Sequence, residues 1–349
     1  MKTTFVSTKA ISEATRLSML RMQSRLVEAQ TEVATGRLAD VGKSLGYQAG
    51  QTVSLRQEHM RLTSIIDVNA GVDTRLDATQ ASLKSLLDGA QAFISQLIAV
   101  RDVDIGPTTI QPYAEGGLGS TIDVLNNSLN GAYLFSGINA DIKPVAKYFQ
   151  TPPGANQQAV ATEFLAAFGM TQSDPGLSAV TAAGMQTFLD GAFANLFDTA
   201  QWTANWSTAS DQDIRSRIST YELVETSTNA NEAGVRKLMS AYTMMADLGV
   251  ENLSQAAFQA VVDTTIRIAG EAIQDLSKLQ GELGVVQERV VKANEKMSIQ
   301  IDIIATHIGA LEGVDPYEAS TRISTLMTQI ETAYALTARI QRLSLLNYL

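Results

Sequence analysis

The chain has 349 residues, enough for two or three domains, and no cysteine, which excludes disulfide frameworks and thiolate metal sites. Its net charge of -10, with only 18% charged residues, argues against nucleic acid as a partner, because neutralising phosphates requires clustered Lys and Arg. No apolar run approaches the length of a membrane span, and residues 1–10 lack the apolar core of a cleaved secretory signal, so any exit from the cell would use a route that reads no such signal.

The first predicted element is an exposed amphipathic helix over residues 17–33. Its apolar positions form a modest stripe: Leu17, Leu20, Leu26, Val27 and Val33. Gly36 follows as a left-handed C-cap. Residues 36–50 contain further glycines and show no hydrophobic period, so they are predicted to form a connector.

A long second helix is predicted over residues 51–103. Its seam repeats every seven residues: Leu55, Leu62, Asn69, Leu76, Leu83, Ala90 and Leu97. Asn69 is either a buried side chain that fixes helix register or a solvated one in a loosened turn, and the pattern favours neither.

Gly106-Pro107 should end this helix. The glycine-rich residues 111–119 should form a loop, and a shorter helix should follow over residues 120–129.

The middle of the chain changes character. Residues 130–137 read Asn-Gly-Ala-Tyr-Leu-Phe-Ser-Gly, which suggests a strand or tight turn pinned into a core. Residues 138–229 are interrupted by prolines and are predicted to form a separate mixed α/β domain, inserted between two helical halves. Within this domain, residues 214–218 and 221–224 are expected to be strands, and residues 188–197 a short helix.

Residues 276–311 form the central helix around which the chain is organised. The apolar positions alternate in steps of three and four: Leu276, Leu279, Leu283, Val286, Val290, Ala293, Met297, Ile301, Ile304, Ile308 and Leu311. Two successive steps of four between Ala293 and Ile301 form a stutter, which locally relaxes a supercoil. A helix of this length needs an equally long partner, and the helix over residues 51–103 can supply it. The predicted fold is therefore mainly α, with a long antiparallel coiled-coil-like bundle formed by the two halves of the chain.

A last helix is predicted after a clear restart signal. Asp315 is expected to be its N-cap, Pro316 its first residue, and Glu318 a side chain that reaches back to the cap. Its seam is Ala319, Ile323, Leu326, Ile330, Ala333, Thr337 and Ile340. The two terminal helices could simply pair with each other. We favour packing against neighbouring copies, because a lone pair leaves apolar surface in water, and we expect the ends up to Gly36 and after Gly313 to be mobile before assembly.

No catalytic, cofactor-binding or metal-binding constellation is predicted. His59 and His307 are the only histidines, and both are interpreted as interhelical or surface residues rather than as a metal pair. Phosphate-loop, zinc-protease and nucleophile-elbow motifs are missing from the sequence. Met19 and Met22, and the pair Met244-Met245, are interpreted as packing residues. An enzyme is the least favoured class of function.

Three segments resemble the flagellin superfamily and, within it, the hook-associated protein 3 family of hook–filament junction proteins. Residues 31–38, Thr-Glu-Val-Ala-Thr-Gly-Arg-Leu, are similar to a segment of that family, with Val33 where the family has Leu. Residues 130–137 are similar to the junction family's Asn-Gly-x-Tyr-Leu-Phe-Ser/Ala-Gly, and residues 343–349 match its C-terminus. Residues 39–44 depart from the family's usual segment.

The resemblance implies a layered arrangement. Residues 1–40 and 315–349 would form an inner, assembly-dependent layer, residues 41–137 and 230–314 the long-helix bundle, and residues 138–229 an outward-projecting domain. The chain would be a structural axial component that adapts the hook to the filament.

The resemblance also implies partners and a location. The chain would self-assemble into a ring or tube, contact a partner hook-associated junction protein and flagellin, and bind an export chaperone. It would be extracellular, exported through the flagellar type III system without a cleaved signal peptide. Two alternatives stay open: a flagellin, or a secreted surface binding protein whose insert recognises a ligand through Trp202 and Trp206.

Overall fold

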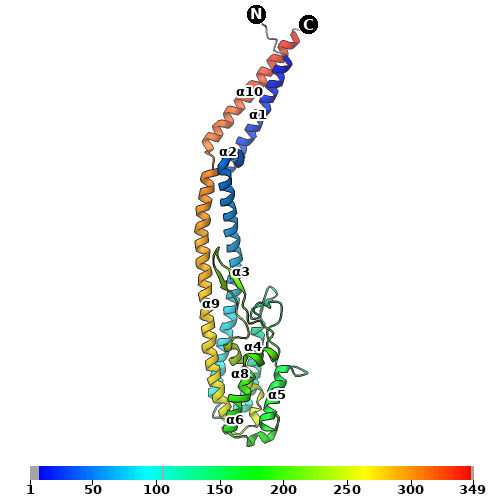
Figure 1. Ribbon diagram of the computed structural model, residues 1–349, viewed down its shortest axis with the longest axis vertical. Helices are drawn as coiled ribbons and strands as arrows, with labels where there is room; N and C mark the ends of the chain where they lie inside the picture. The colour runs from blue at the N-terminus through cyan, green and yellow to red at the C-terminus, as the bar shows by residue number, and fades with distance from the viewer. Residues whose placement is uncertain (1–7, 104–105, 347–349) are drawn as a thin grey trace. The chain divides into compact units, whose positions relative to one another are not determined.

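The computed structural model describes residues 8–103 and 106–346. The chain divides into two compact units. One is Ile65–Glu295, and the other combines the chain up to Ser64 with the chain from Lys296 onward. Figure 1 shows that long helices dominate both units. The mainly α fold predicted from the hydrophobic seams is confirmed.

Most of the described elements are α-helices, and the strands are short. The α-helices are α1 (Thr8–Thr35), α2 (Val41–Leu45), α3 (Ala49–Val100), α4 (Gly106–Leu125), α5 (Ala155–Phe168), α6 (Ala182–Phe188), α7 (Thr199–Asn205), α8 (Ala233–Asp247), α9 (Gln255–Glu312) and α10 (Pro316–Leu346). The strands form two antiparallel pairs: β1 (Ser128–Leu129) with β2 (Ala132–Tyr133), and β3 (Arg215–Arg217) with β4 (Leu223–Glu225). Short 3-10 turns lie at Gly46–Gln48, Pro175–Ala179 and Val250–Asn252, and a π-turn at Leu189–Phe193.

Helices α3 and α9 lie side by side and antiparallel in the 65–295 unit (Figure 1). Three polar contacts mark their register. Asn69 Nδ2 donates to Asn294 Oδ1 at 2.6 Å, and Gln80 Nε2 donates to the Gln280 carbonyl at 2.9 Å. Beyond the end of α3, Arg101 pairs with Asp263 at 2.6 Å. As the residue number rises on one helix it falls on the other, which confirms the predicted antiparallel pairing.

The predicted seams face the interior of each helix pair. Every residue proposed for the α9 seam is buried or half-buried, and Leu276 and Val290 are fully buried. On α3, the heptad positions from Leu76 to Leu97 are fully buried as well. The periods of three and four therefore identified the packed faces of both long helices correctly.

Asn69 is buried, which decides between the two interpretations of this residue. Its side chain has no exposed surface, and its Nδ2 also donates to the Ile218 carbonyl at 2.8 Å. Ile218 lies in the turn between β3 and β4, and Glu222 of the same hairpin pairs with Arg289 of α9 at 2.8 Å. Asn69 therefore anchors the hairpin of the inserted region to the long helices, in addition to interrupting their seam.

The loop predicted over residues 111–119 is wrong, because α4 runs through it. Its glycines serve close helix packing rather than flexibility. A Cβ added at Gly117 would lie 2.3 Å from Tyr242 Cε1 of α8, so only glycine lets these two helices approach so closely. Tyr242 in turn stacks on Phe93 of α3, with ring centroids 4.4 Å apart. Proline and glycine usually interrupt helices, and α4 contains Pro112 as well as the glycines, so the sequence favoured a loop here.

Residues 130–137 form the predicted tight turn. Asn130 and Gly131 have φ values of 53° and 83°, the left-handed geometry of a two-residue hairpin turn between β1 and β2. Leu134 and Phe135 are buried. Gly137 has φ 61°, and a Cβ there would lie 2.5 Å from the Ser210 carbonyl oxygen.

In the inserted region, the two predicted strands are confirmed as β3 and β4. The helix predicted over residues 188–197 is confirmed over residues 188–195, but it begins earlier, at Ala182, and contains a π-helical turn at Leu189–Phe193. Trp202 and Trp206 stack on each other with centroids 5.4 Å apart, and both are buried. They are core residues, which argues against their use in recognising a surface ligand.

Candidate assembly surface

The terminal helices α1 and α10 pack against each other over much of their length (Figure 1). On α10 the described part of the predicted seam faces α1: Ala319 and Leu326 are buried, and Ile323, Ile330, Ala333 and Thr337 are half-buried. Ile340 lies outside the residues whose side chains the structure describes. The cap is also confirmed, since the Tyr317 amide donates to Asp315 Oδ1 at 2.8 Å, whereas Glu318 pairs with Arg322 instead of reaching back.

The inner face of α1 differs from the predicted stripe. The half-buried and buried positions among its described side chains include Thr15, Met19, Met22, Leu26 and Ala29. Their steps of four and three form a helix seam. Of the five residues in the predicted stripe, only Leu26 belongs to this seam. The prediction followed the largest aliphatic residues and missed a seam built from methionine, threonine and alanine.

The pairing of α1 with α10 matches the alternative that we favoured less. The predicted stripe of α10 therefore has a partner in the single chain, whereas most of the predicted stripe of α1 stays exposed. The contact is thin, however. Among the described side chains of the two helices, only four are buried: Ala29, Glu32, Ala319 and Leu326. Two of these are alanines, which remove little apolar surface from water.

Large apolar side chains remain exposed on this pair. Leu17, Leu20 and Val27 of α1 are 50%, 53% and 61% exposed. At about 100° per residue they fall within one sector of the helix, roughly 80° wide. On α10, Met327 and Leu336 are about half exposed, at 48% and 52%, but they are nine residues apart and lie on opposite sides of the helix. The sector of α1 is therefore an apolar surface outside the seam between the two helices.

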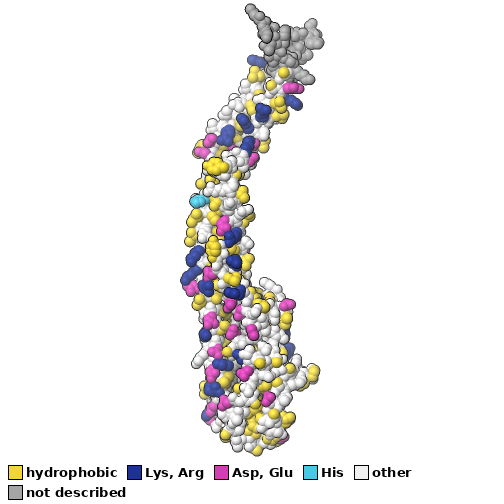
Figure 2. Space-filling view, in the orientation of Figure 1, with side chains coloured by type: hydrophobic (Ala, Val, Ile, Leu, Met, Phe, Trp, Pro, Cys, Tyr) yellow, Lys and Arg dark blue, Asp and Glu magenta, His cyan; other side chains and the backbone are white. Residues whose placement is uncertain are grey.

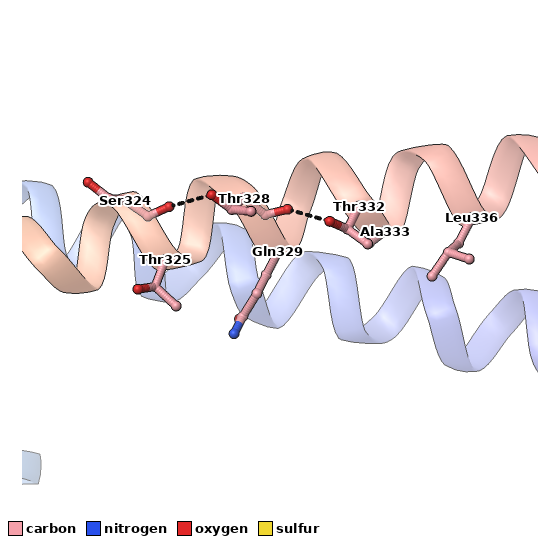
Figure 3. A pocket seen from close by; sticks show the side chains of 7 residues that line it. All are labelled: Ser324, Thr325, Thr328, Gln329, Thr332, Ala333 and Leu336. Carbon is pink, nitrogen blue, oxygen red and sulfur yellow. Dashed lines mark hydrogen bonds between the residues drawn. The ribbon is translucent and has the colours of Figure 1, made fainter.

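A shallow groove runs along α10, on the side of the helix that carries Leu336 (Figure 3). Its volume is about 520 Å³, and its lining residues are Ser324, Thr325, Thr328, Gln329, Thr332, Ala333 and Leu336. The Thr328 hydroxyl donates to the Ser324 carbonyl at 3.0 Å, and the Thr332 hydroxyl to the Thr328 carbonyl at 2.8 Å. Because these hydroxyls are satisfied within the helix, another helix could cover them without leaving a polar group unpaired.

At the base of the helix pair, two breaks in the chain lie side by side. Gly36 ends α1 with φ 69°, and its amide donates to the Glu32 carbonyl at 2.8 Å, as its predicted C-cap role requires. Arg37 and Gly313 form an antiparallel bridge. The connector predicted over residues 36–50 was only partly right, because α2 begins at Val41, with Asp40 as its N-cap.

In the described part of the chain, no group of three or more His, Asp or Glu side chains gathers in a way that could hold a metal ion. His59 is half-buried and His307 is exposed. On the face shown in Figure 2, hydrophobic side chains are interspersed with charged side chains of both signs. Met244 and Met245 are buried packing residues, as predicted.

Comparison with known protein families gives a match at each end of the chain. Residues 6–140 match the bacterial flagellin N-terminal helical region, and residues 266–349 match the bacterial flagellin C-terminal helical region. Together these matches cover well over half of the chain. The chain belongs to the flagellin family.

Individual relatives agree with the family assignment. The chain is 35% identical over 109 residues to flagellin D of Rhizobium meliloti strain 1021 and, to the same extent, to flagellin D from a second Rhizobium meliloti source. The match covers 31% of this flagellin-family chain and 26% of each relative, so it spans about a quarter of their length.

A solved structure shares the fold. It is from Vibrio parahaemolyticus and is described as a flagellar hook-associated protein. The TM-score is 0.54 at 10% identity, with 77% of this chain and 99% of that chain covered. At this identity the likeness concerns the fold alone. None of the described helices of this flagellin-family chain has both the length and the apolarity needed to cross a bilayer.

Proposed function

We propose that this flagellin-family protein is an axial component that joins the hook to the filament. The observation that carries the proposal is the exposed apolar surface of the α1–α10 pair, in a chain whose two ends match flagellin helices. Such a surface suits packing between subunits. Two features favour the junction over the filament: the Asn-Gly-Ala-Tyr-Leu-Phe-Ser-Gly segment at residues 130–137, and the fold shared with a protein described as hook-associated.

In this proposal the parts of the chain have different places in the assembly. Residues 1–40 and 315–349 form an inner layer, residues 41–137 and 230–314 form the bundle around it, and residues 138–229 project outward. The subunits close into a ring that seats on a partner junction protein at the hook and receives the first flagellin subunits. The role is structural rather than catalytic.

We also propose a route to this location. The chain is exported through the flagellar type III system with the help of an export chaperone, and acts outside the cell. Family membership supports this route. An export test would follow the chain into the medium in strains with and without a functional flagellar export gate, and secretion without the gate would contradict it.

The test of the junction role is a strain that lacks the chain. We expect it to assemble hooks and to secrete monomeric flagellin without building filaments. Restoring the full chain should restore filaments, and antibody to the chain should label a single narrow zone at the base of each filament. Normal filaments on the hooks of the deletion strain would refute the proposal.

A second candidate is the filament subunit itself, which the 35% identity to flagellin D favours. Abundance separates the two roles, because a filament contains many more subunits than one ring. Labelling along the whole filament, together with recovery as the most abundant protein of purified filaments, would identify the chain as a flagellin.

A further inference from the structure

The two chain breaks at the base of the terminal helices are tied together by main-chain hydrogen bonds. The Leu38 amide donates to the Glu312 carbonyl at 2.8 Å, and the Val314 amide donates to the Gly36 carbonyl at 3.1 Å. These two bonds connect the segment that leaves α1 with the segment that enters α10. Two such bonds are weak by themselves, since each contributes only about 1 kcal/mol net.

Glu312 adds a buried charge beside this bridge. Its side chain is 1% exposed, and Arg56 of α3 reaches it with both Nε and a terminal nitrogen. The Nε to Oε1 distance is 2.9 Å. Hydrogen bonding to the guanidinium holds the pKa of the Glu312 carboxyl below its usual value. A carboxylate this buried is costly to leave unpaired, so the position of Glu312 depends on that of Arg56.

Glu32 makes a comparable connection from the other side. Its side chain is 8% exposed, and Arg322 of α10 donates to Oε2 at 3.0 Å. The Ala39 amide lies 3.4 Å from Oε1. The carbonyl of Glu32 also accepts the Gly36 amide that ends α1. Glu32 therefore contacts α10 and the connector after α1, as Glu312 contacts α3 and the same connector.

We propose that Glu32 and Glu312 form a two-carboxylate latch. It positions the α1–α10 pair as one body at the joint formed by the two chain breaks, residues 36–38 and 312–314. Each glutamate uses its main chain to hold one chain break and its side chain to hold an arginine on another helix. Separating α1 from α10 breaks the Glu32–Arg322 pair. Displacing the connector after α1 breaks its main-chain bond to Glu312, which Arg56 holds in position. The latch holds the exposed apolar surface in one orientation, whichever position the chain takes in the flagellum.

The test is amide hydrogen exchange of the full-length monomer, measured at Leu38 and Val314. Glu312→Gln keeps the shape of the side chain but removes its charge. We expect exchange at these two amides to accelerate at least tenfold, while exchange in α8 is unchanged. Glu32→Gln should have the same local effect. Unchanged exchange at both amides, or uniform acceleration through α8, would overturn the proposal.

Glu318→Gln is the matched control. Glu318 also pairs with Arg322, at 3.0 Å, but its side chain is 70% exposed. An exposed pair of this kind contributes little, so exchange at Leu38 and Val314 should stay as in the unmodified chain. The double variant Arg56→Gln with Glu312→Gln should accelerate exchange no more than Glu312→Gln alone. Additive effects would show that Arg56 and Glu312 do not act as a pair.

Discussion

The 65–295 unit and the α1–α10 pair both rest on helix seams with steps of three and four, yet they bury different side chains. The larger unit encloses Phe93, Phe164 and Trp202 without exposed surface. The terminal pair encloses two alanines, one leucine and one glutamate among its described side chains. A seam therefore brings two helices together. Large side chains and further layers of structure are needed before the helices bury their apolar surface within a single chain. The terminal pair has neither, and its outer face stays apolar.

The largest expected effect tests the close packing of the larger unit. Gly117→Ala would place a methyl group 2.3 Å from Tyr242 Cε1, so the Tyr242 ring must leave its stack on Phe93 or α4 and α8 must move apart. Overpacking of this kind costs about 1–3 kcal/mol, and we expect the upper end in chemical denaturation. Gly116→Ala is the control, since nothing lies within 4 Å of its added Cβ. It should be neutral or stabilising by up to about 1 kcal/mol. Equal effects would contradict this account of the packing.

The next effect concerns a buried carboxyl in the same unit. Burial raises the pKa of Asp247 to about 6, while the Tyr148 hydroxyl donates to its Oδ2 at 2.6 Å. The folded state therefore binds this proton more tightly than the unfolded state does. The contribution of Asp247 to stability is greatest near pH 4 and is lost as the pH rises to about 6.

Asp247→Asn keeps an acceptor for the Tyr148 hydroxyl and removes the ionisation. We expect the variant to gain about 2 kcal/mol over the unmodified chain at pH 7–8, and little at pH 4. Denaturation midpoints measured across this range test the prediction. A stability difference that does not change with pH would show that Asp247 is not the titrating group.

A smaller and more local effect is expected in the terminal pair. Leu326→Ala removes the largest buried aliphatic side chain of the α1–α10 seam. We expect a loss of about 2 kcal/mol, the low end for such a truncation, because a thin interface can collapse around it. The loss should appear in the helicity of the ends and leave the 65–295 unit intact. Met327→Ala, at a neighbouring exposed position, should have no comparable effect on helicity.

The smallest effect on stability should accompany the largest effect on assembly. Replacing Leu17, Leu20 and Val27 by glutamine changes only exposed positions. Each substitution should alter the free energy of unfolding by no more than about 0.5 kcal/mol. Self-association, measured by sedimentation, should nevertheless be lost. A variant that still assembles would show that this face is not an interface.

Much of the fold could be predicted because the long seams are local patterns. The residues of the α9 seam repeat in steps of three and four with large apolar side chains, and the structure buries or half-buries all of them. The seam of α1 has the same steps, but Met19, Met22 and Ala29 do not stand out from a helix that carries larger leucines on its outer face. In that case side-chain size misled the prediction.

Contacts between distant parts of the chain could not be predicted. Asn69 was identified as unusual, but its partner Ile218 lies in the inserted region, and no local pattern links the two. The same holds for Arg56, on one predicted helix, and Glu312, just after the end of another, because no local pattern in the sequence links the two. The glycines of α4 were read as a loop because their partner, Tyr242, is equally remote in sequence.

Limited proteolysis of the monomeric full chain, read by mass spectrometry, tests the contrast between the two regions most directly. If the terminal pair is incomplete without neighbouring subunits, the first cleavages should fall before Gly36 and after Gly313, and residues 65–295 should resist. The same sites should become protected in the assembled form. First cleavages within residues 65–295, or terminal helices that resist equally in the monomer and in the assembly, would contradict the account.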